Sequence, residues 1–227
     1  MAGADPYGMR YTASMSLPRF SLCLLCAACT GKAADTASMG GRCVASKIVA
    51  ADIDETLTTS DGEWIQQLGD PTHIPEMRPD ANTLMQGYAN LGYRVVYITA
   101  RGEDLVLLDD RPTRAATWDW LTLHGFPGQP EDLFLADGIG VAGDAAVAYK
   151  AGVLGAIDPS GSAATWAYGN ATTDIRAFLE HGIADEQIFL VGELAGTMGV
   201  TSLPDEAAYT THTPDQLSSI APADCLP

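Results

Sequence analysis

Basic residues are scarce in this sequence of 227 residues, which has 12 Lys and Arg against 29 Asp and Glu and a formal net charge of −17. So acidic a surface repels the phosphates of nucleic acids and of anionic bilayers, and electrostatic binding to either partner is disfavoured. Long charge blocks, low-complexity tracts and internal repeats are also missing, which argues against a disordered or repetitive chain. With 47% hydrophobic residues, the chain has enough apolar side chains for one globular domain with a core.

The sequence also lacks an apolar run long enough to span a bilayer as a permanent helix. Its apolar stretch near the amino terminus, residues 20–29, follows Arg10 and Arg19 and ends in small residues, which is the pattern of a secretory signal. We therefore predict a signal peptide over residues 1–29 and a Gly-, Ala-, Ser- and Thr-rich linker over residues 30–46. The predicted product is exported: periplasmic, membrane-anchored or secreted. An apolar tail, or a start codon placed too early, is the alternative.

The end of the apolar stretch resembles the cleavage box of bacterial lipoproteins. Residues 25–29 read Leu-Cys-Ala-Ala-Cys, so Cys29 would be the acylated residue. Cys26 stands where that pattern usually has Leu, which makes the resemblance imperfect. A lipid on Cys29 is the only contact with a membrane that the sequence predicts.

Cysteine is scarce as well, with five residues in the chain. Cys23 and Cys26 would leave with the signal peptide, which leaves Cys43 and Cys225 beside the candidate anchor. An even pair in an oxidising compartment predicts a Cys43–Cys225 disulfide that ties the two termini together.

The segment from residue 47 onward alternates between strand and helix patterns. Short apolar or β-branched runs predict strands, and apolar residues at helical spacing predict helices that end at glycine or proline. The strands are expected at 48–53, 93–99, 164–168 and 187–191, and the helices at about 84–91, 113–124, 142–151 and 172–181. This alternation predicts an α/β domain over residues 47–222, with a mostly parallel sheet flanked by helices.

Polar side chains follow the predicted strands. Asp52 and Asp54 close the first strand, Thr99 closes the second, and Asn170 with Asp174 follows the third. Because ligands bind beyond the carboxyl ends of parallel strands, we expect these side chains to share one site.

The two aspartates are the sharpest feature, because a spacing of two places both on the same side of an extended chain. Asp52 could attack phosphorus as a nucleophile, while Asp54 could protonate the leaving oxygen and then activate water. Mg²⁺ would offset the adjacent negative charges. Alternatively, the aspartates cap a turn.

Four segments together resemble the signatures of the haloacid dehalogenase (HAD) superfamily of phosphatases, in family order. They are Asp-Ile-Asp-Glu-Thr at 52–56, Tyr-Ile-Thr-Ala-Arg at 97–101, Tyr-Lys-Ala-Gly-Val-Leu at 149–154 and Gly-Asn-Ala-Thr-Thr-Asp at 169–174. The resemblance implies a Rossmann-like fold in which Thr99 and Lys150 bind phosphate. It implies Mg²⁺ ligands at Asp52, the carbonyl of Asp54, Asn170 and Asp174. Arg101 could bind the substrate phosphate or remain in solvent.

Within the superfamily, the chain is similar to the catalytic domain of lipins, the phosphatidate phosphatases. The similarity rests on Thr-Thr-Ser-Asp at 58–61, on Tyr-Gly-Asn at 168–170, and on a late Tyr209 and His212 placed before a terminal helix. Lipins usually have Gly where this chain has Glu55, and their basic amphipathic helix is missing. Glu55 instead resembles secreted acid phosphatases, so the substrate class stays open between lipid and soluble phosphomonoesters.

The intervals between the four segments leave no room for a large cap domain. Residues 61–77 suit a flap, in which Trp64 could contact substrate or pack as a half-buried aromatic. The sequence therefore predicts an exported, Mg²⁺-dependent phosphatase acting on a phosphomonoester, with phosphatidate or a related lipid phosphate as one candidate. A nucleotidase or acid phosphatase on soluble substrates, and a non-catalytic phosphatidate-binding module, are the alternatives.

Overall fold

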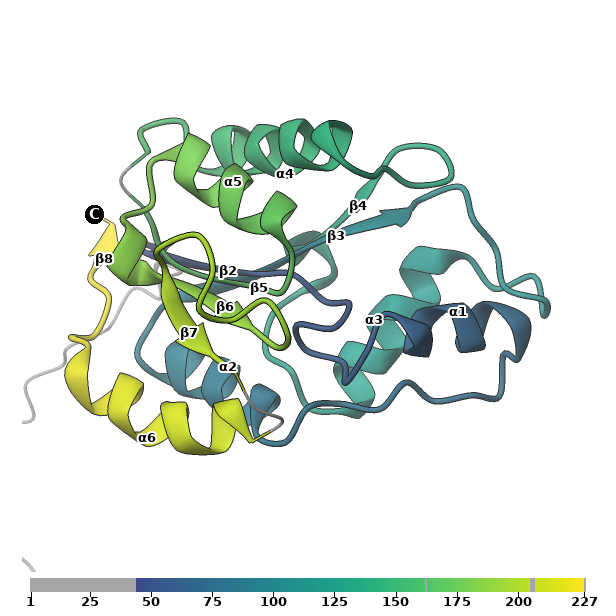
Figure 1. The fold of residues 1–227 in the computed structure, drawn as a ribbon, viewed down its shortest axis with the longest axis horizontal. Helices are drawn as coiled ribbons and strands as arrows, with labels where there is room; N and C mark the ends of the chain where they lie inside the picture. The colour runs from purple at the N-terminus through teal and green to yellow at the C-terminus, as the bar shows by residue number, and fades with distance from the viewer. Residues whose placement is uncertain (1–43, 162, 205–206, 227) are drawn as a thin grey trace, which may run out of the picture. The chain divides into compact units, whose positions relative to one another are not determined.

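A six-stranded sheet forms the centre of the fold (Figure 1). The computed structural model describes residues 44–161, 163–204 and 207–226. The strand order is β4-β3-β2-β5-β6-β7, and every neighbouring pair is parallel. The strands are β2 (Ile48–Ala51), β3 (Arg94–Gly102), β4 (Leu133–Ala136), β5 (Ala164–Gly169), β6 (Ile188–Val191) and β7 (Thr201–Leu203). The prediction of an α/β fold with a parallel sheet is confirmed.

Helices cover both faces of the sheet, with α4 and α5 on one face and α2 and α6 on the other (Figure 1). The α-helices are α1 (Gly62–Gly69), α2 (Ala81–Asn90), α3 (Thr113–Leu123), α4 (Asp144–Ile157), α5 (Thr172–His181) and α6 (Ala208–Ser219). Two short 3₁₀ helices, η1 (Pro130–Asp132) and η2 (Asp185–Gln187), precede β4 and β6.

The central strand β2 is buried on both faces, because its side chains alternate between two cores. Val49 and Ala51 pack in the core that includes residues of α2 and α6, whereas Ile48 and Ala50 pack in the core that includes residues of α4 and α5. This explains why the segment reads as a continuous apolar run.

Four elements, α1, β4, β7 and α4, differ from the sequence-based expectation. The flap contains a helix, α1, and the sheet has two further strands, β4 and β7, which contain four and three residues. Helix α4 continues to Ile157 instead of ending near residue 151, so Gly152 and Gly155 lie inside it. Packing of α4 against α5 and β3, with Leu154 fully buried, outweighs the cost of about 1 kcal/mol per helical glycine.

Helix α6 contacts the loop that follows β2. Tyr209 and His212 lie inside this helix, and not before it as expected. The Tyr209 hydroxyl donates to the carbonyl of Thr56 at 3.0 Å. The Tyr168 hydroxyl lies 3.0 Å from Nε2 of His212 and 2.9 Å from the Tyr88 hydroxyl, so a buried polar network links α6, β5 and α2. These contacts support the loop that carries the aspartates.

The described ends of the chain meet in a second, two-stranded antiparallel sheet, in which β1 (Val44–Ala45) pairs with β8 (Cys225–Leu226). The predicted signal peptide, the lipid anchor at Cys29 and the Cys43 partner of the disulfide lie outside the described residues and stay predictions. Within the described part of the chain, no helix combines the length and the apolar character needed to cross a membrane.

Candidate active site

The predicted site residues gather where the chain reverses its direction across the sheet. From β2 the chain proceeds outward to β3 and β4, then returns to β5 on the other side of β2. Asp52 follows β2 and Asn170 follows β5, so the two lie at the carboxyl ends of neighbouring strands, on either side of this switch point. A cavity of about 670 Å³ opens there, lined by Asp52, Asp54, Arg101, Lys150, Asn170 and Asp174 among others.

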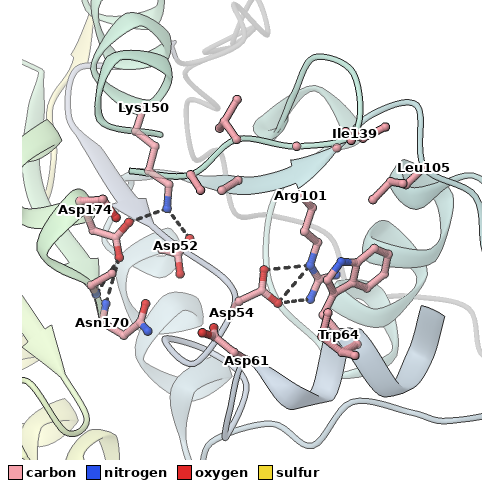
Figure 2. Close-up of a pocket in the computed structure, with 18 of the residues that line it drawn as sticks. Asp52, Asp54, Asp61, Trp64, Arg101, Leu105, Ile139, Lys150, Asn170 and Asp174 are labelled. Atoms are coloured by element: carbon pink, nitrogen blue, oxygen red, sulfur yellow. Dashed lines mark hydrogen bonds and ion pairs between the residues drawn. The ribbon is translucent and has the colours of Figure 1, made fainter. Parts of the chain in front are cut away.

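Lys150 joins two of the carboxylates (Figure 2). Its ammonium donates to Oδ1 of Asp52 at 2.5 Å and to Oδ1 of Asp174 at 2.6 Å. All three side chains are almost fully buried, with residue exposures of 3%, 4% and 1% for Lys150, Asp52 and Asp174. A buried charge requires partners of opposite sign, and each of these groups has one.

The site nevertheless holds more negative than positive charge. Burial raises the pKa of Asp52 to about 7; Lys150 opposes this shift, and the carboxylates of Asp174 and Asp54 add to it. Burial also raises the pKa of Asp61 at the cavity wall, as do Asp54 and Asp174. Although burial disfavours a charged ammonium, Asp174 and Asp52 raise the pKa of Lys150 above its usual value. The cavity therefore favours an added cation.

Asp174 lies in the first turn of α5, where its other oxygen holds the loop after β5. Oδ2 accepts bonds from the backbone N–H groups of Asn170 at 3.1 Å and of Ala171 at 3.0 Å. A Cβ on Gly169 would lie 2.5 Å from the Cβ of Asp174, so this approach requires a glycine there. The Asp174 carboxylate therefore caps the start of α5 with one oxygen and pairs with Lys150 through the other. Both contacts hold Asn170 beside Asp52.

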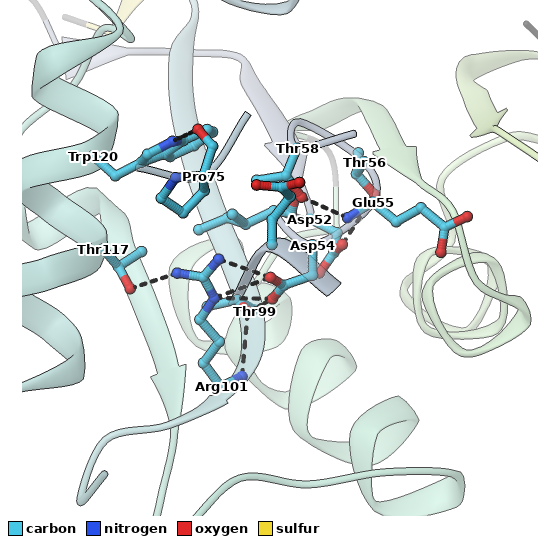
Figure 3. Close-up of polar contacts among 12 residues, drawn as sticks. Asp52, Asp54, Glu55, Thr56, Thr58, Pro75, Thr99, Arg101, Thr117 and Trp120 are labelled. Atoms are coloured by element: carbon cyan, nitrogen blue, oxygen red, sulfur yellow. Dashed lines mark hydrogen bonds and ion pairs between the residues drawn. The ribbon is translucent and has the colours of Figure 1, made fainter. Parts of the chain in front are cut away.

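Asp54 is held by Arg101 and Thr99 (Figure 3). Nη2 of Arg101 donates to Oδ1 of Asp54 at 2.7 Å, Nε donates to Oδ2 at 3.0 Å, and the Thr99 hydroxyl donates to Oδ2 at 3.1 Å. Arg101 is 4% exposed, so it does not remain in solvent. This geometry favours orientation of Asp54 by Arg101, while phosphate binding by Arg101, Thr99 and Lys150 stays a prediction.

Two further side chains complete the surroundings of Arg101: Thr117, which the sequence did not assign to the site, and Trp64, which it offered as a substrate contact or a half-buried aromatic. The Thr117 hydroxyl in α3 accepts from Nη1 at 2.9 Å, and the Trp64 ring in α1 lies over the guanidinium, 4.2 Å from ring centroid to Cζ. Trp64 is buried and also lines the cavity. No local signal marks Thr117, because its contact depends on how α3 packs. The ring is placed for a cation–π contact that keeps the guanidinium in one orientation.

The residues present fit a magnesium ion by the chemistry of their donors. No group of three or more His, Cys, Asp or Glu side chains among the described residues is placed to hold a metal. A Mg²⁺ ion here would therefore combine Asp52 and Asp174 with the amide oxygen of Asn170 and the carbonyl of Asp54. Oxygen donors of this kind suit Mg²⁺, and the raised pKa of Asp52 indicates negative charge that a cation would neutralise.

The opposite wall of the cavity is apolar. It is formed by Trp64, Ile65, Leu68, Leu105, Ile139 and Val141. Figure 2 shows Leu105 and Ile139 on the same side of the cavity as Trp64, and Ile65 and Ile139 are 65% and 79% exposed. The cavity thus combines a charged floor with an apolar wall that reaches solvent.

Comparisons with known proteins identify the family and the fold of the chain. A family model described as PITM 1-3, LNS2 domain matches residues 49–192. No curated protein matches the chain closely enough to count as a relative.

Two solved structures resemble the fold, and a third matches only weakly. A Mesorhizobium loti protein assigned as a HAD-like phosphatase has a TM-score of 0.52 at 19% identity, over 76% of this chain and 84% of that one. D,D-heptose 1,7-bisphosphate phosphatase from B. bronchiseptica, complexed with magnesium and phosphate, has a TM-score of 0.50 at 14% identity, over 75% and 99%. DsGPDH of Dunaliella salina has 0.41 at 14% identity; the match spans 68% of this chain but only 24% of that protein, which is too weak to support an inference.

Proposed function

Since the chain belongs to the LNS2 domain family and has the fold of a HAD superfamily phosphatase, we propose that it is an exported, Mg²⁺-dependent phosphomonoester phosphatase with Asp52 as the nucleophile. The prediction of a HAD-type phosphatase is confirmed by the family and the fold. The observation that carries the finer proposal is the buried arrangement of Lys150 between Asp52 and Asp174, with Asp54 held beside them in one cavity.

The reaction would proceed in two displacements at phosphorus. A carboxylate oxygen of Asp52 forms a bond to phosphorus while the bond to the leaving oxygen breaks, and Asp54 gives its proton to that oxygen. Asp54 then accepts a proton from water, whose oxygen attacks the aspartyl phosphate and releases inorganic phosphate and the free Asp52 carboxylate. Lys150 would offset the negative charge of the phosphoryl group throughout. Mg²⁺, when bound, would supply further neutralisation and fix the phosphate oxygens.

A lipid phosphate is the substrate class that the cavity favours. An apolar wall beside a charged floor suits a phosphomonoester whose phosphate is attached to an apolar body. Because the protein is strongly acidic, attraction to an anionic bilayer would not deliver such a substrate. The predicted lipid on Cys29 would deliver the domain to a membrane instead, and this anchor, the export and the Cys43–Cys225 disulfide are parts of the same proposal.

A substrate panel tests this function. Phosphate release would be measured from phosphatidate in micelles, from nucleotides and from small soluble phosphomonoesters, each with Mg²⁺ and with a chelator. We expect release that requires Mg²⁺ and is fastest for phosphatidate. Release from the soluble substrates alone would favour the acid phosphatase alternative, and binding of phosphatidate without release would identify a binding module.

The two-pronged contact between Arg101 and Asp54 leads to a second prediction. In Arg101→Lys the charge remains, but the two-pronged contact with the carboxylate is lost. Because misplacement of a catalytic group by about 1 Å costs up to about 100-fold in rate, we expect kcat to fall by roughly 10- to 100-fold with KM nearly unchanged. Steady-state kinetics on the best substrate would measure both constants.

Arg114→Lys is the matched control. Arg114 contacts Glu103 through the same two-pronged geometry, at 2.7 and 2.6 Å, and neither residue lines the cavity. Arg114 also donates to the carbonyl of Leu133 at 2.8 Å, which lies outside the cavity as well. Its replacement should leave kcat within about twofold of the wild type, since it alters only contacts away from the cavity. Equal effects of the two substitutions would contradict the positioning role of Arg101.

A further inference from the structure

The backbone of Glu55 has a conformation that non-glycine residues rarely adopt. Its φ is 55°, in the left-handed region. Contacts on both sides hold it there: its N–H donates to the Thr58 hydroxyl at 2.9 Å, and its carbonyl accepts from Nε of Arg78 at 2.8 Å. A glycine would adopt this conformation without strain, so a glutamate at this position calls for a reason in its side chain.

The Glu55 side chain contacts a candidate metal ligand. It extends away from the Asp54–Arg101 pair (Figure 3), and its Oε2 accepts a bond from Nδ2 of Asn170 at 3.1 Å. The other end of the same amide, Oδ1, lies 3.2 Å from the Thr56 hydroxyl, which donates to Oδ2 of Asp52 at 2.9 Å. A carboxylate accepts hydrogen bonds and donates none when ionised, so these contacts together assign the orientation of the amide.

We propose that Glu55 is a positioning residue that holds the Asn170 amide with its oxygen toward the cation site and its nitrogen away from it. This inference rests on the proposed function, because it concerns the Mg²⁺ ligands of that site. A hard cation binds an amide through oxygen, and the reversed amide would present N–H groups to it instead. Residues behind metal ligands commonly set ligand orientation in this way. The contact joins residues 115 positions apart, so it forms only in the folded chain.

The first test compares Mg²⁺ binding with stability in Glu55→Gly. Calorimetric titration of Mg²⁺ into substrate-free protein should give a dissociation constant about 10-fold weaker than in the wild type. Thermal unfolding in chelator should occur at a temperature no lower than that of the wild type, because glycine relieves the left-handed backbone. A purely structural role for Glu55 predicts the opposite pair of results.

Asp110→Gly is the matched control for this substitution. Asp110 also has a left-handed φ of 62°, is exposed and does not line the cavity. Its replacement removes one carboxylate and relaxes one backbone position, as Glu55→Gly does. We expect Mg²⁺ affinity within about twofold of the wild type, and an equal weakening in both variants would overturn the proposal.

A double substitution separates orientation from simple attraction between Glu55 and the cation. In an Asn170→Asp background both side-chain oxygens are equivalent, so no residue is needed to orient them. Adding Glu55→Gly there should change Mg²⁺ affinity by much less than it does in the wild-type background, since no amide remains to be oriented. If Glu55→Gly weakens Mg²⁺ binding equally in both backgrounds, Glu55 acts by charge alone and the inference fails.

Failure of the inference and failure of the proposed function give different results. Wild-type protein that binds Mg²⁺ and releases phosphate, together with a Glu55→Gly variant of equal Mg²⁺ affinity, overturns the inference alone. Wild-type protein that neither binds Mg²⁺ nor releases phosphate overturns the proposed function.

Discussion

Replacing Asp52 by asparagine should abolish phosphate release and leave the metal-free protein at least as stable as the wild type. Activity should fall by several orders of magnitude, because an amide cannot act as the nucleophile. The hydrogen bonds survive: the amide oxygen accepts from Lys150, and the amide nitrogen donates to the Thr56 hydroxyl, which then donates to Asn170. A released-phosphate assay and chemical unfolding in chelator would measure the two effects.

The stability part of this prediction follows from the sign of the pKa shift. Asp52 has a folded-state pKa of about 7, above its ordinary value, mainly because of burial. Its ionised form therefore destabilises the fold, by an amount that is absent below about pH 4 and grows as the pH rises to about 7. Removing the charge should increase the free energy of unfolding at neutral pH by roughly 1–4 kcal/mol.

Asp158→Asn is the control of opposite sign. Burial by itself would raise the pKa of Asp158, but bonds from the backbone N–H groups of Ala164 and Ala163 and from the Ser160 hydroxyl lower it to about 2. Its ionised form stabilises the fold above about pH 4, and this stabilisation is lost as the pH falls toward 2. Asp158→Asn should therefore lower stability at neutral pH and leave turnover intact. If Asp52→Asn loses as much stability as Asp158→Asn, the interpretation that the charge of Asp52 destabilises the fold is wrong.

Replacing Lys150 by methionine should both inactivate and destabilise the protein. The substitution leaves the carboxylates of Asp52 and Asp174 buried without their common cation. Breaking a buried ion pair by removing one partner costs about 3–5 kcal/mol, and we expect a loss of this size in denaturant unfolding at neutral pH. The loss should shrink at acidic pH as the Asp52 carboxylate, whose pKa is raised, takes up a proton. Mg²⁺ should restore part of the stability by linkage.

An exposed ion pair on the same side of the sheet provides the comparison for Lys150. Arg176 in α5 contacts Asp144 in α4 at 2.8 Å, with side-chain exposures of 45% and 88%. Arg176→Met should cost less than about 1 kcal/mol, because solvent screens the pair. If Lys150→Met costs no more stability than Arg176→Met, Lys150 does not stabilise the two buried carboxylates, and the electrostatic account of the site is wrong.

Much of the candidate site could be predicted because its residues sit in short, locally recognisable segments. Asp52 and Asp54 follow a run of apolar residues, and burial of β2 on both faces is what produces that run. Asp174 in the first turn of α5 and Gly182 at its end mark that helix by capping chemistry. Elements without such marks were missed: β7 has three residues, two of them not fully buried, so it carries little hydrophobic pattern.

The contacts between these segments could not be predicted from local pattern. Arg101 was expected to contact phosphate or solvent, yet its donors contact Asp54 and Thr117. This follows because α3, which carries Thr117, packs against β4, and because the Trp64 ring of α1 lies over the guanidinium. The position of Glu55 in the Asp-Ile-Asp-Glu-Thr segment allowed a comparison with acid phosphatases. Its hydrogen bond to Asn170 could not be predicted, because it requires β2 and β5 to be neighbours in the sheet. Parallel strands can be ordered in several ways with the same local sequence pattern.

By itself, the sequence determined the alternation of strands and helices, the acidic character of the surface and the set of groups available for phosphoryl chemistry, since side-chain type and local periodicity carry that information. Only the tertiary structure decided which groups meet. The order β3-β2-β5 places Asp52 next to Asn170, and α4 then brings Lys150 between Asp52 and Asp174. These arrangements depend on burial of two cores and on charge pairing away from water, which are properties of the whole fold and of no single segment.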